Sequence, residues 1–158
     1  MFKKIVVALN GSPEALAALE PARTLADKFG AEMHLVSVEY PRSPQGQEWK
    51  LTQAAYLDKK KQELQDYLDH WAEKLGRNGR KISTAVLPLG SPVSRLVDEL
   101  TASGADLLVL YSHGRSGLSR LFFGSTAEEL NRLASCPILV VHPLEESLQQ
   151  PPGPPNPG

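Results

Sequence analysis

Short apolar runs rich in β-branched residues alternate with longer segments of helical periodicity along almost the whole chain. Strands need only four to eight such residues, whereas amphipathic helices place apolar residues three or four positions apart. Strict strand–helix alternation is typical of α/β proteins, in which helices cover both faces of a parallel sheet. We therefore expect a five-stranded parallel open sheet in a Rossmann-type three-layer sandwich. The predicted strands are residues 4–9, 33–38, 82–87, 107–110 and 137–141, and the predicted helices are residues 13–29, 51–75, 92–103 and 125–133.

Two of the predicted helices begin with the same tripeptide. Gly11-Ser12-Pro13 and Gly90-Ser91-Pro92 each follow a predicted strand. Serine is a favourable N-cap and proline a favourable first helical residue, so we expect Ser12 and Ser91 to cap their helices. In the second helix, which spans residues 51–75, the lysines at 59–61 are expected on the solvated face.

A glycine- and arginine-rich loop joins the fourth strand to the last helix. Free N–H groups at a helix start, together with the helix dipole, favour an anion, and glycine lets backbone and ligand approach closely. An equally weighted interpretation from the pattern alone is plain turn chemistry, because Ser125-Thr126-Ala127-Glu128 is a capping box. The residues of this loop that could hold an anion are Gly114, Arg115, Gly117, Arg120, Gly124 and Ser125.

The carboxyl ends of several predicted strands carry turn or polar residues. In an open parallel sheet these ends share one edge, and ligands bind there where the strand order reverses. Asn10, Val38 and the segment 111–114 all lie at such ends. Their position favours the interpretation of the glycine-rich loop as part of a ligand site.

Length and composition indicate one ordinary globular domain, expected over residues 1–144. A net charge of −1 gives no electrostatic basis for binding nucleic acid. The apolar run from Ile5 to Leu9 is too short for a signal core or a membrane span, so no membrane association is expected. The single cysteine, Cys136, excludes an internal disulfide and fits a reducing cytoplasm. Residues 145–158 form a proline-rich tail that we expect to be disordered.

Motifs for several enzyme classes are missing from the sequence. There is no P-loop, no Gly-x-Gly-x-x-Gly after the first strand, and no zinc-binding pattern. The four histidines are scattered, and no acid–base pair is recognisable. We therefore predict no catalytic residue and no metal ligand, and expect that the protein is not an enzyme beyond weak ATP hydrolysis.

The chain resembles the universal stress protein (UspA-like) family over about residues 2–143. The resemblance rests on the opening segment KKIVVALNGS, on ADLLVLYSHGRSGL, on LFFGSTAEEL and on SCPILVV. It implies the adenine-nucleotide α-hydrolase-like fold and a ligand that is ATP or a related adenine nucleotide, with or without Mg²⁺. It also implies a cytoplasmic homodimer paired through residues 137–141, which fits an apolar edge strand.

Two positions depart from the ATP-binding pattern of the family. In that pattern a glycine is followed after two residues by a second glycine, and after nine more by Gly-Ser or Gly-Thr. Here Gly114 and Gly124-Ser125 match, but Tyr111 replaces the first glycine, and Asn10 replaces an aspartate. The tyrosine ring could crowd the ligand, which we favour, or stack on it. The resemblance implies as ligand-binding residues Leu9, Asn10, Val38, Tyr111, His113, Gly114, Arg115, Gly117, Gly124, Ser125 and Thr126.

Three hypotheses for function follow. The first is a stress-response sensor or regulator that binds an adenine nucleotide, which the intact phosphate half of the motif favours. The second is the same fold without stable nucleotide binding, acting through protein partners, which Tyr111 and Asn10 favour. The third, a weak ATP hydrolase, lacks a recognisable base.

Overall fold

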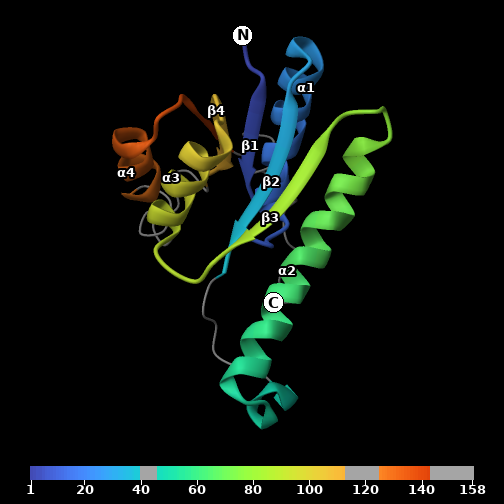
Figure 1. Cartoon of the computed structure of the whole chain (residues 1–158), viewed down its shortest axis with the longest axis vertical. Helices are drawn as coiled ribbons and strands as arrows, with labels where there is room; N and C mark the ends of the chain where they lie inside the picture. The colour runs from blue at the N-terminus through green and yellow to red at the C-terminus, as the bar shows by residue number, and fades with distance from the viewer. Residues whose placement is uncertain (40–45, 113–124, 143–158) are drawn as a thin grey trace, which may run out of the picture.

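Five parallel strands form a single sheet at the centre of the molecule (Figure 1). The computed structural model describes residues 1–39, 46–112 and 125–142. The sheet order is β3-β2-β1-β4-β5, which confirms the predicted open parallel sheet. The predicted tail, residues 145–158, lies outside the described residues. The strands are β1 (Lys4–Ala8), β2 (Glu32–Val38), β3 (Ile82–Leu87), β4 (Leu107–Tyr111) and β5 (Ile138–Val141).

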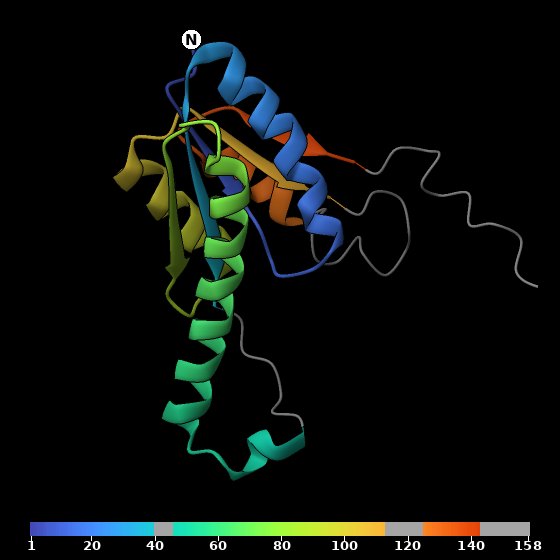
Figure 2. The same ribbon diagram turned by 90° about the vertical axis from the view of Figure 1, so that its right-hand side faces the viewer.

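Helices cover both faces of this sheet, and Figures 1 and 2 show them as two separate layers. One layer holds η1 (Glu14–Ala18), α1 (Leu19–Phe29) and α2 (Gln53–Gly76), and the other holds α3 (Pro92–Ser103) and α4 (Ser125–Leu133). A further short helix, η2 (Gly46–Lys50), precedes α2. Within the described ranges, no helix is both long enough and apolar enough to cross a membrane.

Side chains of the central strands point alternately into the two layers. From β1, Ile5 and Val7 pack with α1 and α2, whereas Val6 packs with α3. All three are completely buried, and each such side chain contributes about 1.5–3 kcal/mol of transfer free energy. Two hydrophobic clusters therefore hold the strand ends in fixed positions relative to the helices.

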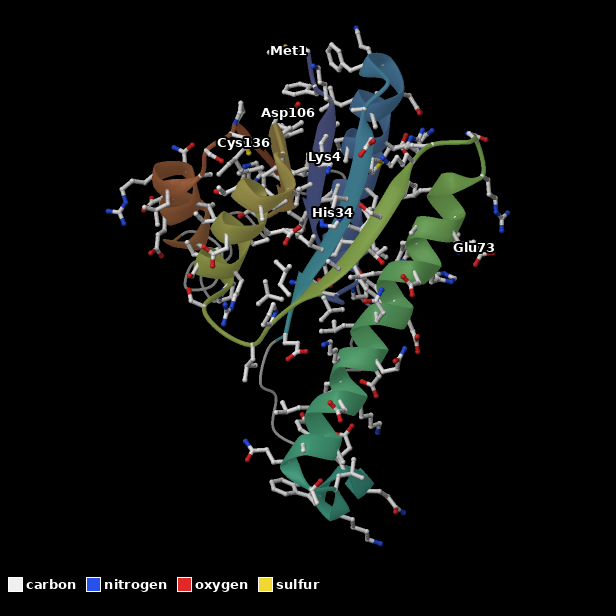
Figure 3. The ribbon with its side chains drawn as sticks, viewed as in Figure 1. Met1, Lys4, His34, Glu73, Asp106 and Cys136 are labelled. Carbon is white, nitrogen blue, oxygen red and sulfur yellow. The ribbon has the colours of Figure 1, made fainter. Side chains whose placement is uncertain are left out.

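Polar contacts anchor the amino end of the sheet. The Asp106 carboxylate accepts hydrogen bonds from the backbone N–H groups of Lys3 (2.8 Å) and Lys4 (3.3 Å). Figure 3 shows Lys4 and Asp106 at the same end of the sheet. These contacts tie β1 to the start of β4 and fix the register of the two strands.

Predicted helix boundaries hold to within about two residues, except that the α-helix predicted from residue 13 begins only at Leu19, after the 3-10 helix η1. Two caps also differ. The helix predicted to start at residue 51 begins at Gln53, because Thr52 Oγ1 accepts a hydrogen bond from the Ala55 N–H. Ser91 occupies the N-cap position, as predicted, but its side chain makes no capping hydrogen bond. Pro92, already fixed near helical φ and lacking an N–H, starts that helix without such a bond.

Candidate functional site: a cavity at the carboxyl edge of the sheet

The carboxyl ends of three strands meet at one edge. Ala8 pairs in register with Val36 of β2 on one side and with Leu110 of β4 on the other. The strand order reverses at β1, because β2 lies on one side of it and β4 on the other. The residues that follow β1 therefore stand at the switch point, where open parallel sheets bind ligands.

A cavity of about 230 Å³ opens at this edge. The strand ends contribute Asn10, Gly11 and Val38, of which Asn10 and Val38 are predicted ligand residues. The remaining wall comes from one face of α2, which sequence reasoning missed. Its members recur at spacings of three and four residues and so share one helix face, but no sequence signal marks that face as a cavity wall: Lys60, Glu63, Leu64 and Tyr67.

The turn after β1 shapes the floor of the cavity. Asn10 Oδ1 accepts a hydrogen bond from the Ser12 N–H at 2.9 Å, which closes a short Asx turn. Gly11 has φ +81°, a conformation that glycine adopts without steric cost. With its side-chain oxygen engaged by Ser12, Asn10 keeps its amide N–H groups as donors toward a ligand.

Lys60 does not lie simply on the solvated face, as predicted from its place in the lysine run. Its ammonium group lies 2.8 Å from Glu48 and 3.2 Å from Glu63, and its side chain is about two-thirds buried. Hydrogen bonds to Glu48 and then Glu63 raise the pKa of Lys60, so the amine stays charged. Glu48 also binds Lys59 at 3.2 Å, and these four residues form the charge cluster discussed below.

The Tyr67 hydroxyl is buried beside the cavity. Among the described residues it has no hydrogen-bond partner. Burial raises the pKa of Tyr67, so the hydroxyl stays protonated through the neutral range. A buried hydroxyl without a partner destabilises the folded state, a cost that natural proteins retain at few positions.

Tyr111 and Leu9 belong to the hydrophobic core rather than to the cavity wall. Tyr111 ends β4 with 7% of its surface exposed and lies in the same cluster as Leu9, Ala15 and Ala18. Burial, and secondarily the negative charge of Glu14, raise the pKa of Tyr111. This placement favours a packing role for the ring; its effect on ligand affinity stays a prediction.

Of the other predicted ligand residues, only Ser125 and Thr126 belong to the described ranges. His113, Gly114, Arg115, Gly117 and Gly124 lie outside the described residues. Ser125 is the first residue of α4, as expected, and Thr126 follows it half-buried in the first turn. The start of α4 therefore follows β4, the strand beside β1 at the switch point, and the phosphate half of the site stays a prediction.

A hydrogen-bonded chain of serine, histidine and glutamate lies on the face of the sheet that α3 covers. No sequence pattern predicts it. His34 Nδ1 lies 2.7 Å from Ser83 Oγ, and His34 Nε2 lies 2.9 Å from Glu99 Oε1. Figure 3 shows His34 on β2. Its partners come from β3 and α3, so the chain ties two strands and a helix together.

Comparison with known proteins agrees with this architecture. The Universal stress protein family model matches residues 1–142. The chain belongs to the universal stress protein family. Universal stress protein MJ0531 of Methanocaldococcus jannaschii is 33% identical over 145 residues, covering 89% of this chain and 82% of that protein.

Solved structures of universal stress proteins share the fold. A universal stress protein in complex with cAMP superposes with a TM-score of 0.61 at 24% identity, covering 89% of this chain and 97% of that one. The universal stress protein from Archaeoglobus fulgidus in complex with dAMP gives a TM-score of 0.62 at 21% identity, covering 88% and 97%. At these identities the similarity concerns the fold.

Proposed function

We propose that this universal stress protein binds ATP or a related adenine nucleotide and acts as a sensor or regulator of the cytoplasmic stress response. The cavity beside the switch point carries this proposal. It lies where parallel sheets bind ligands, and Asn10 and Val38, both expected to contact a nucleotide, line it. The complexes of related folds with cAMP and dAMP support an adenine nucleotide as the ligand.

The nucleotide would extend across the end of β1. Its base would occupy the cavity, its ribose would meet the Asn10 amide, and its phosphates would meet Ser125 at the start of α4. The sequence motif adds Gly114 and Gly124 as phosphate-binding residues. Backbone N–H groups at a helix start favour phosphate oxygens. Mg²⁺ would serve only to balance phosphate charge, because the sequence offers no dedicated ligand set.

Mass spectrometry of nucleotide released from the purified, denatured protein would identify the ligand. Calorimetry with ATP should then give micromolar affinity, about −8 kcal/mol. Gly124→Val should abolish this binding, because a β-branched side chain blocks close approach of the phosphate to the backbone. The absence of both binding heat and a thermal shift at millimolar ATP would contradict the proposal.

We expect the nucleotide to act as a bound effector rather than as a substrate. The sequence shows no recognisable acid–base pair that would activate a water at the phosphates. Hydrolysis of ATP faster than its exchange with bulk nucleotide would contradict an effector role.

We also propose a homodimer paired through β5. This strand is an edge of the sheet, and all four of its apolar residues are only half-buried in the single chain. Val140→Pro should break the dimer by removing a ladder donor, with circular dichroism as the check on folding. Removing residues 146–158 should leave the dimer intact. A wild-type monomer at tens of micromolar in light scattering would contradict this assembly.

A second candidate function, action through a protein partner without stable nucleotide binding, is favoured by an exposed aromatic residue. Trp49 of η2 is 70% exposed, and the neighbouring Leu51 is 41% exposed. Tryptophan is enriched among residues that dominate protein–protein binding. Loss of partner capture on Trp49→Ala, in a protein that shows no nucleotide binding, would favour this candidate.

A further inference from the structure

The charged groups that α2 presents to the cavity belong to one charge cluster. Lys60 and Glu63 line the cavity directly, while Glu48 and Lys59 belong to the cluster but not to the cavity wall. The cluster contains two lysines and two glutamates, so its formal charge is balanced. Such a wall does not attract a phosphate group, and it suits a neutral polar group instead.

The ammonium group of Lys60 has one N–H that is not directed to a carboxylate. An ammonium group carries three N–H bonds. Two of these are directed to carboxylates, Glu48 at 2.8 Å and Glu63 at 3.2 Å. Tyr56 adds a cation–π contact, with the ammonium nitrogen 5.6 Å from its ring centroid. These contacts hold the amine in one place, so the third N–H can meet a ligand without a further loss of side-chain freedom.

The apolar part of the wall fits a planar ring. Val38 and Leu64 line the same cavity as Lys60. A heterocyclic base offers apolar faces together with neutral nitrogen acceptors at its edge. The edge farthest from the sugar would point away from Asn10 and toward α2, if the ribose lies at Asn10 as proposed above.

We infer that Lys60 determines base recognition by donating its third N–H to the N1 nitrogen of the bound adenine. This inference rests on the proposed nucleotide binding. Lys60 is thus a specificity-determining residue from a helix whose sequence suggests only a solvated lysine run. Its two carboxylate partners position it and compensate its charge, which disfavours a phosphate at the same place.

A pair of lysine variants tests this role. Lys60→Met removes the donor and keeps the length of the side chain. Lys59→Met is the matched control, because Lys59 is paired with the same two glutamates at 3.2 and 3.9 Å and does not line the cavity. Calorimetry of each variant would use AMP and its 1-deaza analogue, in which a C–H group replaces N1.

Lys60→Met should weaken AMP binding about tenfold, since a hydrogen bond from a charged donor is lost. The same variant should change binding of the 1-deaza analogue less than twofold, and Lys59→Met should change neither. Equal losses for both ligands, or equal affinities of Lys60→Met and wild type for AMP, would overturn the role of Lys60 alone. Failure of the wild-type protein to bind AMP or ATP would overturn the proposed function as well.

Discussion

The tripeptide Gly-Ser-Pro follows a strand twice, and the two copies start their helices differently. In the first copy, Asn10 and Ser12 close an Asx turn, and Ser12 Oγ accepts a hydrogen bond from the Ala15 N–H at 3.3 Å. The helix begins as η1, with the Leu16 N–H bonded to the Pro13 carbonyl at 3.3 Å. Regular α-helix follows only from Leu19.

The second copy enters its α-helix at once. Ser91 is extended, with φ −62° and ψ 123°, and its side chain makes no capping bond. The Arg95 N–H binds the Ser91 carbonyl at 3.0 Å, which is the four-residue step of an α-helix. The Arg95 guanidinium also donates to the Leu89 carbonyl at 3.0 Å and so holds the preceding turn.

The residue before the glycine accounts for part of this difference. Asparagine at position 10 has a side chain that can accept a hydrogen bond from the second residue along, whereas leucine at position 89 has none. The first copy forms the floor of the 230 Å³ cavity, while Leu89 borders only a hollow of about 20 Å³. The same tripeptide therefore indicates where a helix starts, and its neighbour decides whether the turn is shaped for a ligand.

Among the substitutions that compare the two copies, Gly11→Ala should have the largest effect on stability. Because Gly11 has φ +81°, alanine should lower the free energy of unfolding by about 1–2 kcal/mol. The added methyl group would lie 3.8 Å from Leu64 Cδ2, at the cavity wall, so AMP affinity should fall too. Gly79→Ala is the matched control, with φ +75° and open space around it. Chemical denaturation should show similar losses for both, and calorimetry a loss for Gly11→Ala alone.

Serine substitutions compare the two copies directly. Ser12→Ala removes an acceptor for the Ala15 N–H and should cost about 1 kcal/mol. Ser91→Ala removes no capping bond and should change the free energy of unfolding by less than about 0.5 kcal/mol. Urea denaturation of both variants measures the difference. Equal losses would show that the hydroxyl groups act alike and that the two starts are energetically equivalent.

Strands and helices could be predicted from this sequence because their signals are local. Apolar runs, the spacing of leucines and the glycine and proline punctuation all act within a few residues. Every strand and α-helix of the described ranges begins and ends near its predicted place, except α1, which begins at Leu19 after the short helix η1. The carboxyl ends of β1 and β2 follow from topology alone, and for that reason Asn10 and Val38 were foreseen at the cavity.

The α2 wall of the cavity could not be predicted in the same way. Lys60 and Glu63 have the composition of a solvated helix face, and only the packing of α2 across the strand ends brings them to the cavity. Tyr111 shows the same limit, because its place in a motif indicates a ligand contact, whereas packing against η1 puts its ring in the core, and its effect on ligand affinity stays a prediction. Long-range packing decides both cases, and a local pattern does not encode it.

Asn10→Asp changes only the first copy, and its expected effect on AMP affinity is smaller than the effects of the glycine and serine substitutions on stability. The carboxylate can still accept from the Ser12 N–H at the position that Asn10 Oδ1 now occupies, and its second oxygen can accept from a ribose hydroxyl. We expect AMP affinity to rise about threefold, or roughly 0.65 kcal/mol. Calorimetry measures this gain, and thermal unfolding without ligand checks that the turn is kept. Weaker binding would place the ribose away from residue 10.

The smallest effect concerns the residue after each proline, which is Glu14 in the first copy and Val93 in the second. Burial first, and then the charge of Glu14, raise the pKa of Tyr111 above its ordinary value of about 10. A raised pKa in the folded state means stability that is complete below pH 10 and is lost as the pH rises through the folded pKa.

Glu14→Gln should lower the pKa of Tyr111 toward its ordinary value and so reduce this alkaline loss. Absorbance titration at 295 nm, with Tyr111→Phe to assign the transition, measures the shift, and denaturation at pH 7 and pH 11 measures its consequence. The pKa of Tyr67, which burial alone raises, should not move. Glu20→Gln serves as the control, because Glu20 lies on the same segment but is paired with Arg23. A Tyr111 transition unchanged by Glu14→Gln would mean that solvent screens the carboxylate, and that the charge at this position does not distinguish the first copy from the second.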